Sequence, residues 1–372
     1  MPHLTPSTFV VASPAARRRF GLRESTWRTF LLASLMAALA CLPLGSIANA
    51  GIIEWVTVGD PGNTADTTGV PNPTGAVATS FRIMKYQFTN QLYTDFLNSV
   101  AATDTYSLYN ASMGADALGG ITQSGSPGSY SYSARTNMGD KPVNHVSWFD
   151  AARVSNWLMN GALSSSSTET GAYTLVGGQT TGTAPAVNSG ATFYVPTEDQ
   201  RYKAAYYKGG GTNAGYWDYA TQSDSAPTAV TAGSTGIGSA GSTGNFANYN
   251  KVADWNSQDG NVTTVGTNGG PSFYGAFDMS GNVTEWNDLT GAPGSSRGLR
   301  GGGWDSPAAS YLSSSSRYSL ATFLEGSYIG FRLASPVSGP SGVPEIDPSG
   351  LSAVLGLLFG GLGLLERRRY SR

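Results

Sequence analysis

The sequence predicts an α+β fold with few helices, short strands and long ordered loops. Helical spacing of apolar residues occurs in three segments, each preceded by a polar residue that can cap a helix. The apolar segments that suit strands are short. Stretches rich in Gly, Ser and Thr separate these elements, and we expect loops or short hairpins at residues 119–137, 161–190 and 209–245.

The first helix is expected at residues 90–100, with a cap from Thr89 or Asn90 and apolar residues on one face. The second follows Ser147, with Asp150 in its first turn and a stop signal at Gly161.

The third helix follows Thr197, which forms a capping box with Gln200, and buries Tyr202, Ala205 and Tyr206. Short strands are expected at residues 81–89, 192–195, 298–300 and 330–333.

Residues 1–50 have the features of an export signal. Five arginines between Arg17 and Arg28 precede an apolar stretch at residues 30–44, and Ala48-Asn49-Ala50 is a cleavage site of small residues. We therefore expect a signal peptide over residues 1–50 and a mature chain that starts at Gly51. A membrane anchor is the alternative, for which this stretch is short.

Residues 336–372 form a linker and a tail. Val343-Pro344-Glu345 precedes an apolar run at residues 351–365, and Glu366 and three arginines follow. This order resembles the PEP-CTERM sorting signal of exported bacterial proteins. The resemblance implies an exosortase-type processing enzyme as a partner, and a location at the cell surface or in the extracellular matrix. A simple C-terminal anchor is the alternative. Contact with a membrane is expected only through the leader and this tail.

Composition excludes several classes of protein. Only 12% of the residues are charged and the net charge is −2, whereas nucleic-acid binding requires a clustered basic face. The single cysteine, Cys41, lies in the leader, so the mature chain has no thiol, disulfide or thiolate-bound metal. Beyond His3 in the leader, the chain has only His145, which excludes a zinc site with several histidines.

Five segments follow one another in an order that is typical of one family. They are TNQLYTDFLNSV, PVNHVSWFDAARVSNWL, YVPTEDQRYKAAYYKGG, YGAFDMSGNVTEWND and LRGGGWDSP…SRYSL…IGFRLA. Together they resemble the formylglycine-generating, or sulfatase-modifying factor, family. The resemblance implies that family's variant of the C-type-lectin fold over residues 51–335.

The same resemblance bears on catalysis. In formylglycine generators, two cysteines after an Arg-Gly-Gly-Ser motif bind copper(I) and engage the substrate. The matching segment here is WDSPAASYLSSSS, in which Ser306 and Tyr311 lie near the positions of the thiols. Copper(I) prefers soft sulfur ligands, so we expect no copper and no catalytic residue. Trp304, Ser306 and Tyr311 are instead candidates for binding a ligand.

Two segments resemble calcium-binding segments of the family. In FDMSGNVTEW the resemblance implies side-chain oxygens of Asp278 and Glu285 and the carbonyls of Gly281 and Val283 as Ca²⁺ ligands. Hard oxygen ligands around a tight glycine turn suit Ca²⁺. The alternative is a capped turn with Trp286 in the core.

The second segment is NYNKVADWNSQDGN, where the interval is shorter than in the family. The resemblance implies Asn248, the Tyr249 carbonyl, Asp259 and the Asn261 carbonyl as ligands. Both ions would stabilise loops, because an ion that binds only the folded state adds stability.

Three functions remain open from the sequence. The first is an exported surface or matrix protein with a non-catalytic domain, whose Trp and Tyr residues bind a glycan or a peptide. The second is an active enzyme of the family, either an oxidase or an acid–base catalyst. Its carboxylates would come from Asp254, Asp259, Asp305 and Glu325. The third is a purely structural matrix protein. Buried pairing is expected for Arg300, Arg317 and Arg332.

Overall fold

The computed structural model describes residues 53–337, and the predicted leader and sorting tail lie outside this range. Its helices are α2 (Asn90–Val100), α3 (Ser112–Ala115), α4 (Trp148–Met159) and α5 (Glu198–Tyr206), with 3-10 turns η1 (Val176–Gly178) and η2 (Ala309–Leu312). Its strands are β1 (Trp55–Val58), β2 (Phe81–Met84), β3 (Ile121–Ser124), β4 (Ser131–Ala134), β5 (Thr228–Ala229), β6 (Phe246–Ala247), β7 (Thr284–Asn287), β8 (Ser296–Arg300), β9 (Tyr318–Ala321), β10 (Ile329–Gly330) and β11 (Ala334–Pro336). The predicted α+β fold is confirmed. None of the helices in residues 53–337 has the length and apolarity needed to cross a membrane.

The three predicted helices begin at the predicted caps. The Thr89 side chain accepts a backbone N–H of the first turn of α2. At α4, Ser147 and Asp150 form a reciprocal capping box, and Thr197 and Gln200 do the same at α5. These boundaries follow from side chains close in sequence, which is why the sequence predicts them.

Three of the sequence motifs meet in one four-stranded sheet, in the order β10-β7-β8-β9. β7 pairs antiparallel with β8, so that Glu285 lies opposite Arg300, and parallel with β10, so that Glu285 also lies opposite Gly330. β9 is an outer strand that pairs antiparallel with β8. The sheet therefore places the GNVTEW, RGGGW and GFR segments side by side.

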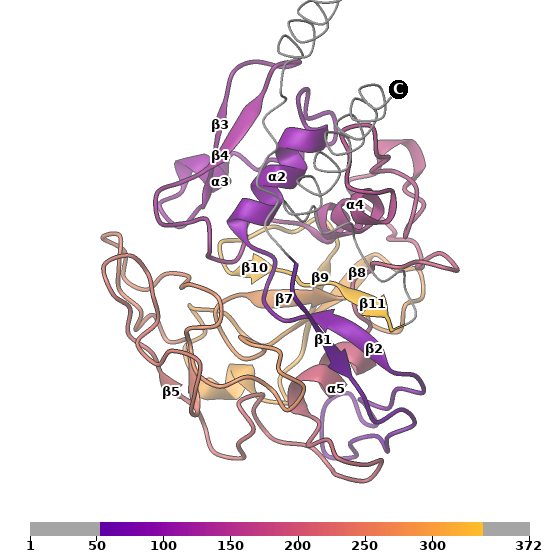
Figure 1. Cartoon of the computed structure of the whole chain (residues 1–372), viewed down its shortest axis with the longest axis vertical. Helices are drawn as coiled ribbons and strands as arrows, with labels where there is room; N and C mark the ends of the chain where they lie inside the picture. The colour runs from indigo at the N-terminus through magenta and orange to yellow at the C-terminus, as the bar shows by residue number, and fades with distance from the viewer. Residues whose placement is uncertain (1–52, 338–372) are drawn as a thin grey trace, which may run out of the picture. The chain divides into compact units, whose positions relative to one another are not determined.

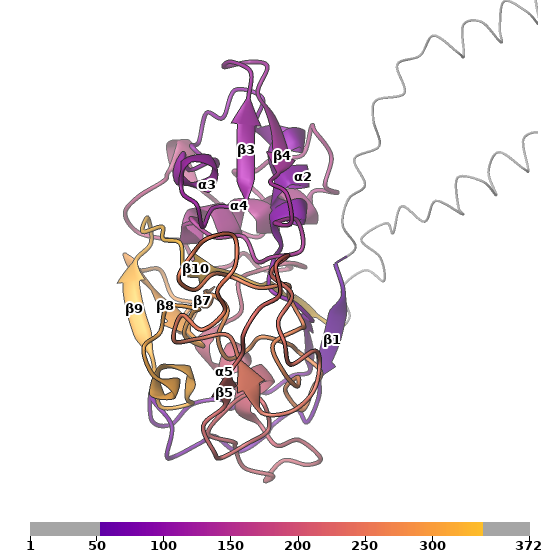
Figure 2. The ribbon, with the colours of Figure 1, turned by 90° about the vertical axis from the view of Figure 1, so that its left-hand side faces the viewer.

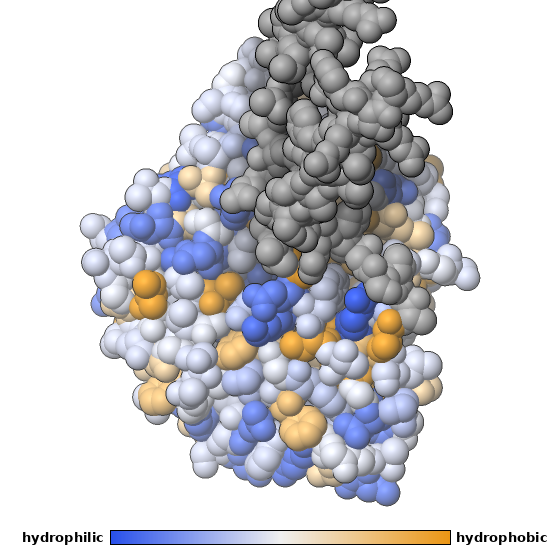
Figure 3. Space-filling model, viewed as in Figure 1, coloured by the Kyte–Doolittle hydropathy of each residue, from blue (hydrophilic) through white to orange (hydrophobic). Residues whose placement is uncertain are grey.

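A second sheet has the order β1-β2-β11, with antiparallel pairing throughout. Both views place α2 and α4 on one side of the four-stranded sheet and α5 on the other (Figures 1 and 2). The largest apolar core joins α2 and α4 to the four-stranded sheet through Trp286, Leu299 and Ile329. A smaller core joins α5 to β2 through Tyr202, Phe81 and Ile83. On the face shown in Figure 3, apolar side chains form small groups separated by polar ones.

The predicted strands are partly wrong in extent. The strand expected at residues 81–89 ends at Met84, because the next residues bond to several separate segments, including Phe277 and Phe331. Residues 192–195 form only an isolated bridge between Tyr194 and Ala334. Of the strand expected at residues 330–333, only Gly330 lies in β10, and residues 331–333 lie between β10 and β11. The loop rich in Gly and Ser at residues 119–137 contains the predicted hairpin, β3–β4.

Candidate functional site

The segment with the four predicted calcium ligands forms a tight turn that leads into β7. Asp278 and Gly281 have positive φ angles of 55° and 89°. Gly281 is required by space as well, since a Cβ atom there would lie 2.5 Å from the Asn248 carbonyl oxygen. β7, the strand that follows this turn, is buried along its whole length. The turn is therefore anchored to the interior of the domain.

The predicted ligands converge on one atom, the side-chain nitrogen of Gln87. Gln87 Nε2 donates to Glu285 Oε1 and to the Val283 carbonyl, both at 3.0 Å. The carbonyl oxygens of Asp278 and Gly281 lie 3.2 Å and 3.3 Å from the same nitrogen. The structure therefore brings the four residues together, although Asp278 contributes its backbone carbonyl where the sequence predicts its carboxylate.

Glu285 lies between two buried guanidinium groups. Arg332 Nη2 is 2.7 Å from Glu285 Oε1, and Arg201 Nε is 3.2 Å from Glu285 Oε2. All three side chains are fully buried. Burial opposes ionisation of the carboxyl, but the charges of Arg332 and Arg201 outweigh it and lower the pKa of Glu285. This carboxylate is therefore ionised and already neutralised by the protein.

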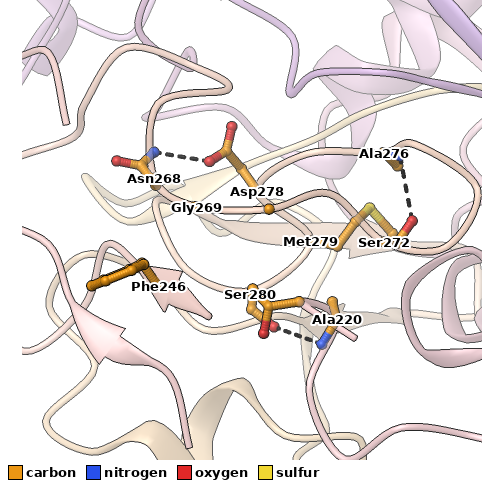
Figure 4. A pocket seen from close by; sticks show the side chains of 11 residues that line it. Ala220, Phe246, Asn268, Gly269, Ser272, Ala276, Asp278, Met279 and Ser280 are labelled. Atoms are coloured by element: carbon orange, nitrogen blue, oxygen red, sulfur yellow. Dashed lines mark hydrogen bonds between the residues drawn. The ribbon is translucent and has the colours of Figure 1, made fainter. Parts of the chain in front are cut away.

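The Asp278 carboxylate faces a different part of the molecule. Its oxygens accept hydrogen bonds from the Gly266 N–H at 2.6 Å and from Asn268 Nδ2 at 2.8 Å. Burial raises its pKa, and these two donors act against the shift. Asn268 and Asp278 line a cavity of about 10 Å³, into which Ser280 also faces (Figure 4). That volume is close to one water molecule, so the cavity has no room for an organic ligand.

The second predicted calcium set comes together only in part. Asn248 Nδ2 donates to the Asn261 carbonyl at 2.9 Å and to Thr263 Oγ1 at 3.0 Å, and both asparagines are fully buried. Tyr249 is half-buried, and its hydroxyl donates to the Pro227 carbonyl. Asp259 is exposed, so the only carboxylate of the set is on the surface while its asparagines are in the interior.

The ligand-binding candidates have different surroundings. Trp304 is buried beside Trp255 and Val283, and its Nε1 donates to the Ser327 carbonyl at 3.1 Å. Ser306 is buried, and its Oγ accepts the Gly303 N–H at 3.0 Å. Both side chains therefore hold the loop together.

Of the three candidates, Tyr311 alone is exposed, with 37% of its surface accessible, and it stacks on Tyr318 with ring centroids 6.1 Å apart. Tyr318 begins the outer strand β9 and is 46% exposed, and Tyr328, which precedes β10, is 37% exposed. Ideal Cβ positions at Gly302 and Gly303 would lie within 3.3 Å of the backbones of Tyr311 and Tyr328. We call the stacked pair Tyr311 and Tyr318 the tyrosine face. The Tyr311 backbone borders the glycine triplet, and β9, which begins at Tyr318, lies on the opposite side of the molecule from β1 (Figure 2).

The carboxylates considered for acid–base chemistry have separate roles. Asp254 accepts the Gly260 N–H at 2.9 Å, and Glu325 accepts a hydrogen bond from Asn110. Burial raises the pKa of Asp305, which lies beside Gly303. Within residues 53–337, no cluster of three or more Asp, Glu, His or Cys side chains is arranged to hold a metal ion.

Arg300 and Arg332 are buried and paired as expected, whereas Arg317 is only half-buried. Arg300 bonds to Glu198 and to the carbonyls of Ser314 and Ser316, and Arg317 Nε lies 3.6 Å from Glu198 Oε1. His145, the remaining histidine, lies 3.4 Å from Asp116, and its burial lowers its pKa.

Calcium fits the first set of residues poorly. Only one carboxylate of the set, that of Glu285, faces the centre, and two arginines already neutralise it. The centre itself is occupied by an amide nitrogen. The sequence did not identify Gln87 as a site residue, because its partners lie 191 to 198 positions further along the chain. Tyr318 was also missed, although it lies within the SRYSL segment.

A further hollow of about 460 Å³ is lined by Asp66, Lys208 and Tyr216 among others. Its carboxylate is already engaged, because Asp66 accepts hydrogen bonds from Tyr202 and Thr68.

These observations define the class of protein. It is an α+β domain in which three short motifs meet in one sheet, with long loops around a glycine triplet. The family described as the sulfatase-modifying factor enzyme 1-like domain matches residues 51–337, and the chain belongs to it. Curated proteins include no match to the sequence.

Three solved structures are similar to the chain. CarF is 20% identical, and the match covers 77% of this chain and 99% of CarF with a TM-score of 0.46. The variable protein 1 of Treponema denticola is 19% identical over 77% of this chain and 97% of its own, with a TM-score of 0.44. PvdO from Pseudomonas aeruginosa is 19% identical over 77% of this chain and 92% of its own, with a TM-score of 0.38.

Proposed function

We propose that this chain is an exported, non-catalytic member of its family that binds a glycan or peptide ligand at the cell surface or in the extracellular matrix. The observation that carries the proposal is the tyrosine face, which includes Tyr311, close to one of the positions where the family resemblance places the thiols. The single cysteine of the chain, Cys41, precedes the domain. The domain therefore has no thiolate that could bind copper(I) for oxidation chemistry.

The loop that replaces the thiols is closed by its own hydrogen bonds. Ser306 bonds to Gly303, and the Ser306 carbonyl accepts the Asn250 N–H at 2.9 Å. Leu312 is fully buried beneath the loop, and its carbonyl accepts the Tyr206 hydroxyl at 3.1 Å. This arrangement leaves Ser306 no role towards a substrate, and it holds the neighbouring tyrosines on a fixed backbone.

The tyrosine face suits recognition by contact. Tyrosine rings supply a large surface at a small cost in side-chain entropy, and their hydroxyls supply hydrogen bonds. β9 is an outer strand of its sheet, and an outer strand can pair with an extended peptide. The proposed ligand is therefore either a glycan or an extended peptide.

Export is supported by the basic and apolar leader and by the PEP-CTERM-like tail. The predicted exosortase-type enzyme would process that tail. Cell fractionation of a tagged chain tests the location, and recovery of the full-length chain in the cytoplasm would contradict it.

The binding proposal is tested with the mature chain on glycan and peptide arrays. The variant Tyr311→Ala/Tyr318→Ala is compared with Phe273→Ala, which removes another exposed ring outside the tyrosine face. We expect the double variant to lose the ligand and the control to keep it. Binding that survives the double variant, or stoichiometric copper in the purified protein, would contradict the proposal.

A further inference from the structure

The cradle that resembles a calcium site is formed by three backbone carbonyls, of Asp278, Gly281 and Val283, and by the carboxylate of Glu285. We propose that the side-chain amide of Gln87 takes the place of a metal ion in this cradle, so that the loop is ordered without calcium. This inference does not depend on the proposed function.

Distances support an amide at the centre. The four oxygens lie 3.0 to 3.3 Å from Gln87 Nε2. Hydrogen bonds from an amide N–H have lengths of about 2.7–3.2 Å, whereas Ca²⁺ lies about 2.3–2.6 Å from its oxygen ligands. The nitrogen has two hydrogens, which the two shorter contacts to Glu285 and Val283 use, and the other two carbonyls face the positive side of the same group.

The orientation of the amide is fixed by its surroundings. Gln87 is fully buried, and its Oε1 has no hydrogen-bond partner. Exchanging the two ends would set Oε1 against four oxygens, which repel it. The nitrogen therefore points inward, although this leaves the oxygen without a partner.

Charge also favours a neutral group. Arg201 and Arg332 supply two positive charges to the single carboxylate of Glu285. A divalent cation in the cradle would add two more positive charges in a buried region where the like charges are poorly screened. An amide supplies donors without adding charge.

The backbone on either side holds Gln87 in place. The Lys85 carbonyl accepts the Phe277 N–H at 2.8 Å, and the Phe88 N–H donates to the Phe331 carbonyl at 2.9 Å. Arg332 Nη1 donates to the Met84 carbonyl at 3.1 Å. These contacts join Gln87 to the segments that carry the cradle, so the side chain cannot withdraw without moving them.

The test begins with the wild-type mature chain. We expect purification without chelator to leave no stoichiometric calcium on the protein, and the melting temperature to be the same in calcium chloride and in EDTA. The deciding measurement is a crystal structure from a solution that contains calcium. Gln87 Nε2 at hydrogen-bond distance from the four oxygens would support the proposal, and an ion at about 2.3–2.6 Å from them would overturn it.

Two variants extend the test. Gln87→Ala leaves the oxygens of the cradle without a donor, and we expect its melting temperature to fall by about 5–15 °C. Gln91→Ala on the surface of α2 is the matched control, with little change expected. A melting temperature of Gln87→Ala equal to that of the wild type would contradict a structural role for the amide.

Discussion

Replacing Glu285 by glutamine removes the carboxylate that Arg201 and Arg332 share. The shape of the side chain is kept, but two fully buried guanidinium groups lose their counter-charge. Removing one partner of a buried ion pair costs about 3–5 kcal/mol, because the other charge stays buried without compensation. For a domain of this size, the melting temperature should fall by roughly 10 °C.

Thermal and urea unfolding, followed by circular dichroism, measure this loss. The matched control is Glu54→Gln, which breaks the exposed Lys85–Glu54 pair of 2.8 Å and should cost less than about 1 kcal/mol. If Glu285→Gln is as stable as the control, Glu285 does not hold the two arginines as described.

The dependence on pH gives a second measure of the same cluster. Because Arg332 and Arg201 lower the pKa of Glu285 against the effect of burial, its stabilisation is complete above the pKa of the unfolded chain. It is lost as the pH falls through the lower pKa of the folded state. The stability difference between the wild type and Glu285→Gln should therefore shrink at acidic pH, and a difference that grows there would contradict the sign.

Three further predictions follow from single residues. Burial, followed by the charge of the neighbouring Glu325, raises the pKa of Asp150 to about 8, so the free energy of unfolding should fall as the pH rises from about 4 to 8. Asp150→Asn should flatten this slope, and the exposed Asp259→Asn should not. Gly281→Ala should destabilise the domain more than Gly62→Ala, since both have positive φ but only Gly281 has a backbone oxygen within 2.5 Å of the new Cβ; equal unfolding midpoints in urea would refute this. Leu312→Ala should cost about 2–5 kcal/mol by opening a cavity beneath the loop, and a loss below 1 kcal/mol in urea unfolding would show that the site collapses.

The helices were predictable because their signals are local. Ser147 and Asp150 lie three residues apart, and the capping box they form needs no other part of the chain. β7 was not predicted, because all four of its residues are buried and show no alternation of polar and apolar positions. The strand expected at residues 81–89 was too long for a related reason: its second half bonds to several separate segments, which no local pattern reveals.

The candidate site shows the same division. The family resemblance implied that Asp278, Gly281, Val283 and Glu285 share a site, and one turn of the chain brings these four residues together. Gln87 comes from the far end of the domain sequence, and nothing near it indicates what its amide meets. Likewise, the segment after the glycine triplet showed that thiols are absent, but only the packing shows that Ser306 is buried while Tyr311 is exposed.

Long loops need polar side chains to fix them, because they lack the ladder of backbone hydrogen bonds that a sheet provides. In this domain buried amides fill that role: Asn248 joins Asn261 to Asn282, and Gln87 joins the cradle to the end of β2. Amides can do so at neutral charge and without a bound ion. A loop held in this way is rigid before a ligand arrives, which lowers the entropy lost on binding. The loop before Tyr311 is tied to the segment that follows Asn248, because the Ser306 carbonyl accepts the Asn250 N–H at 2.9 Å. This bond helps to fix the backbone on which the proposed binding surface depends.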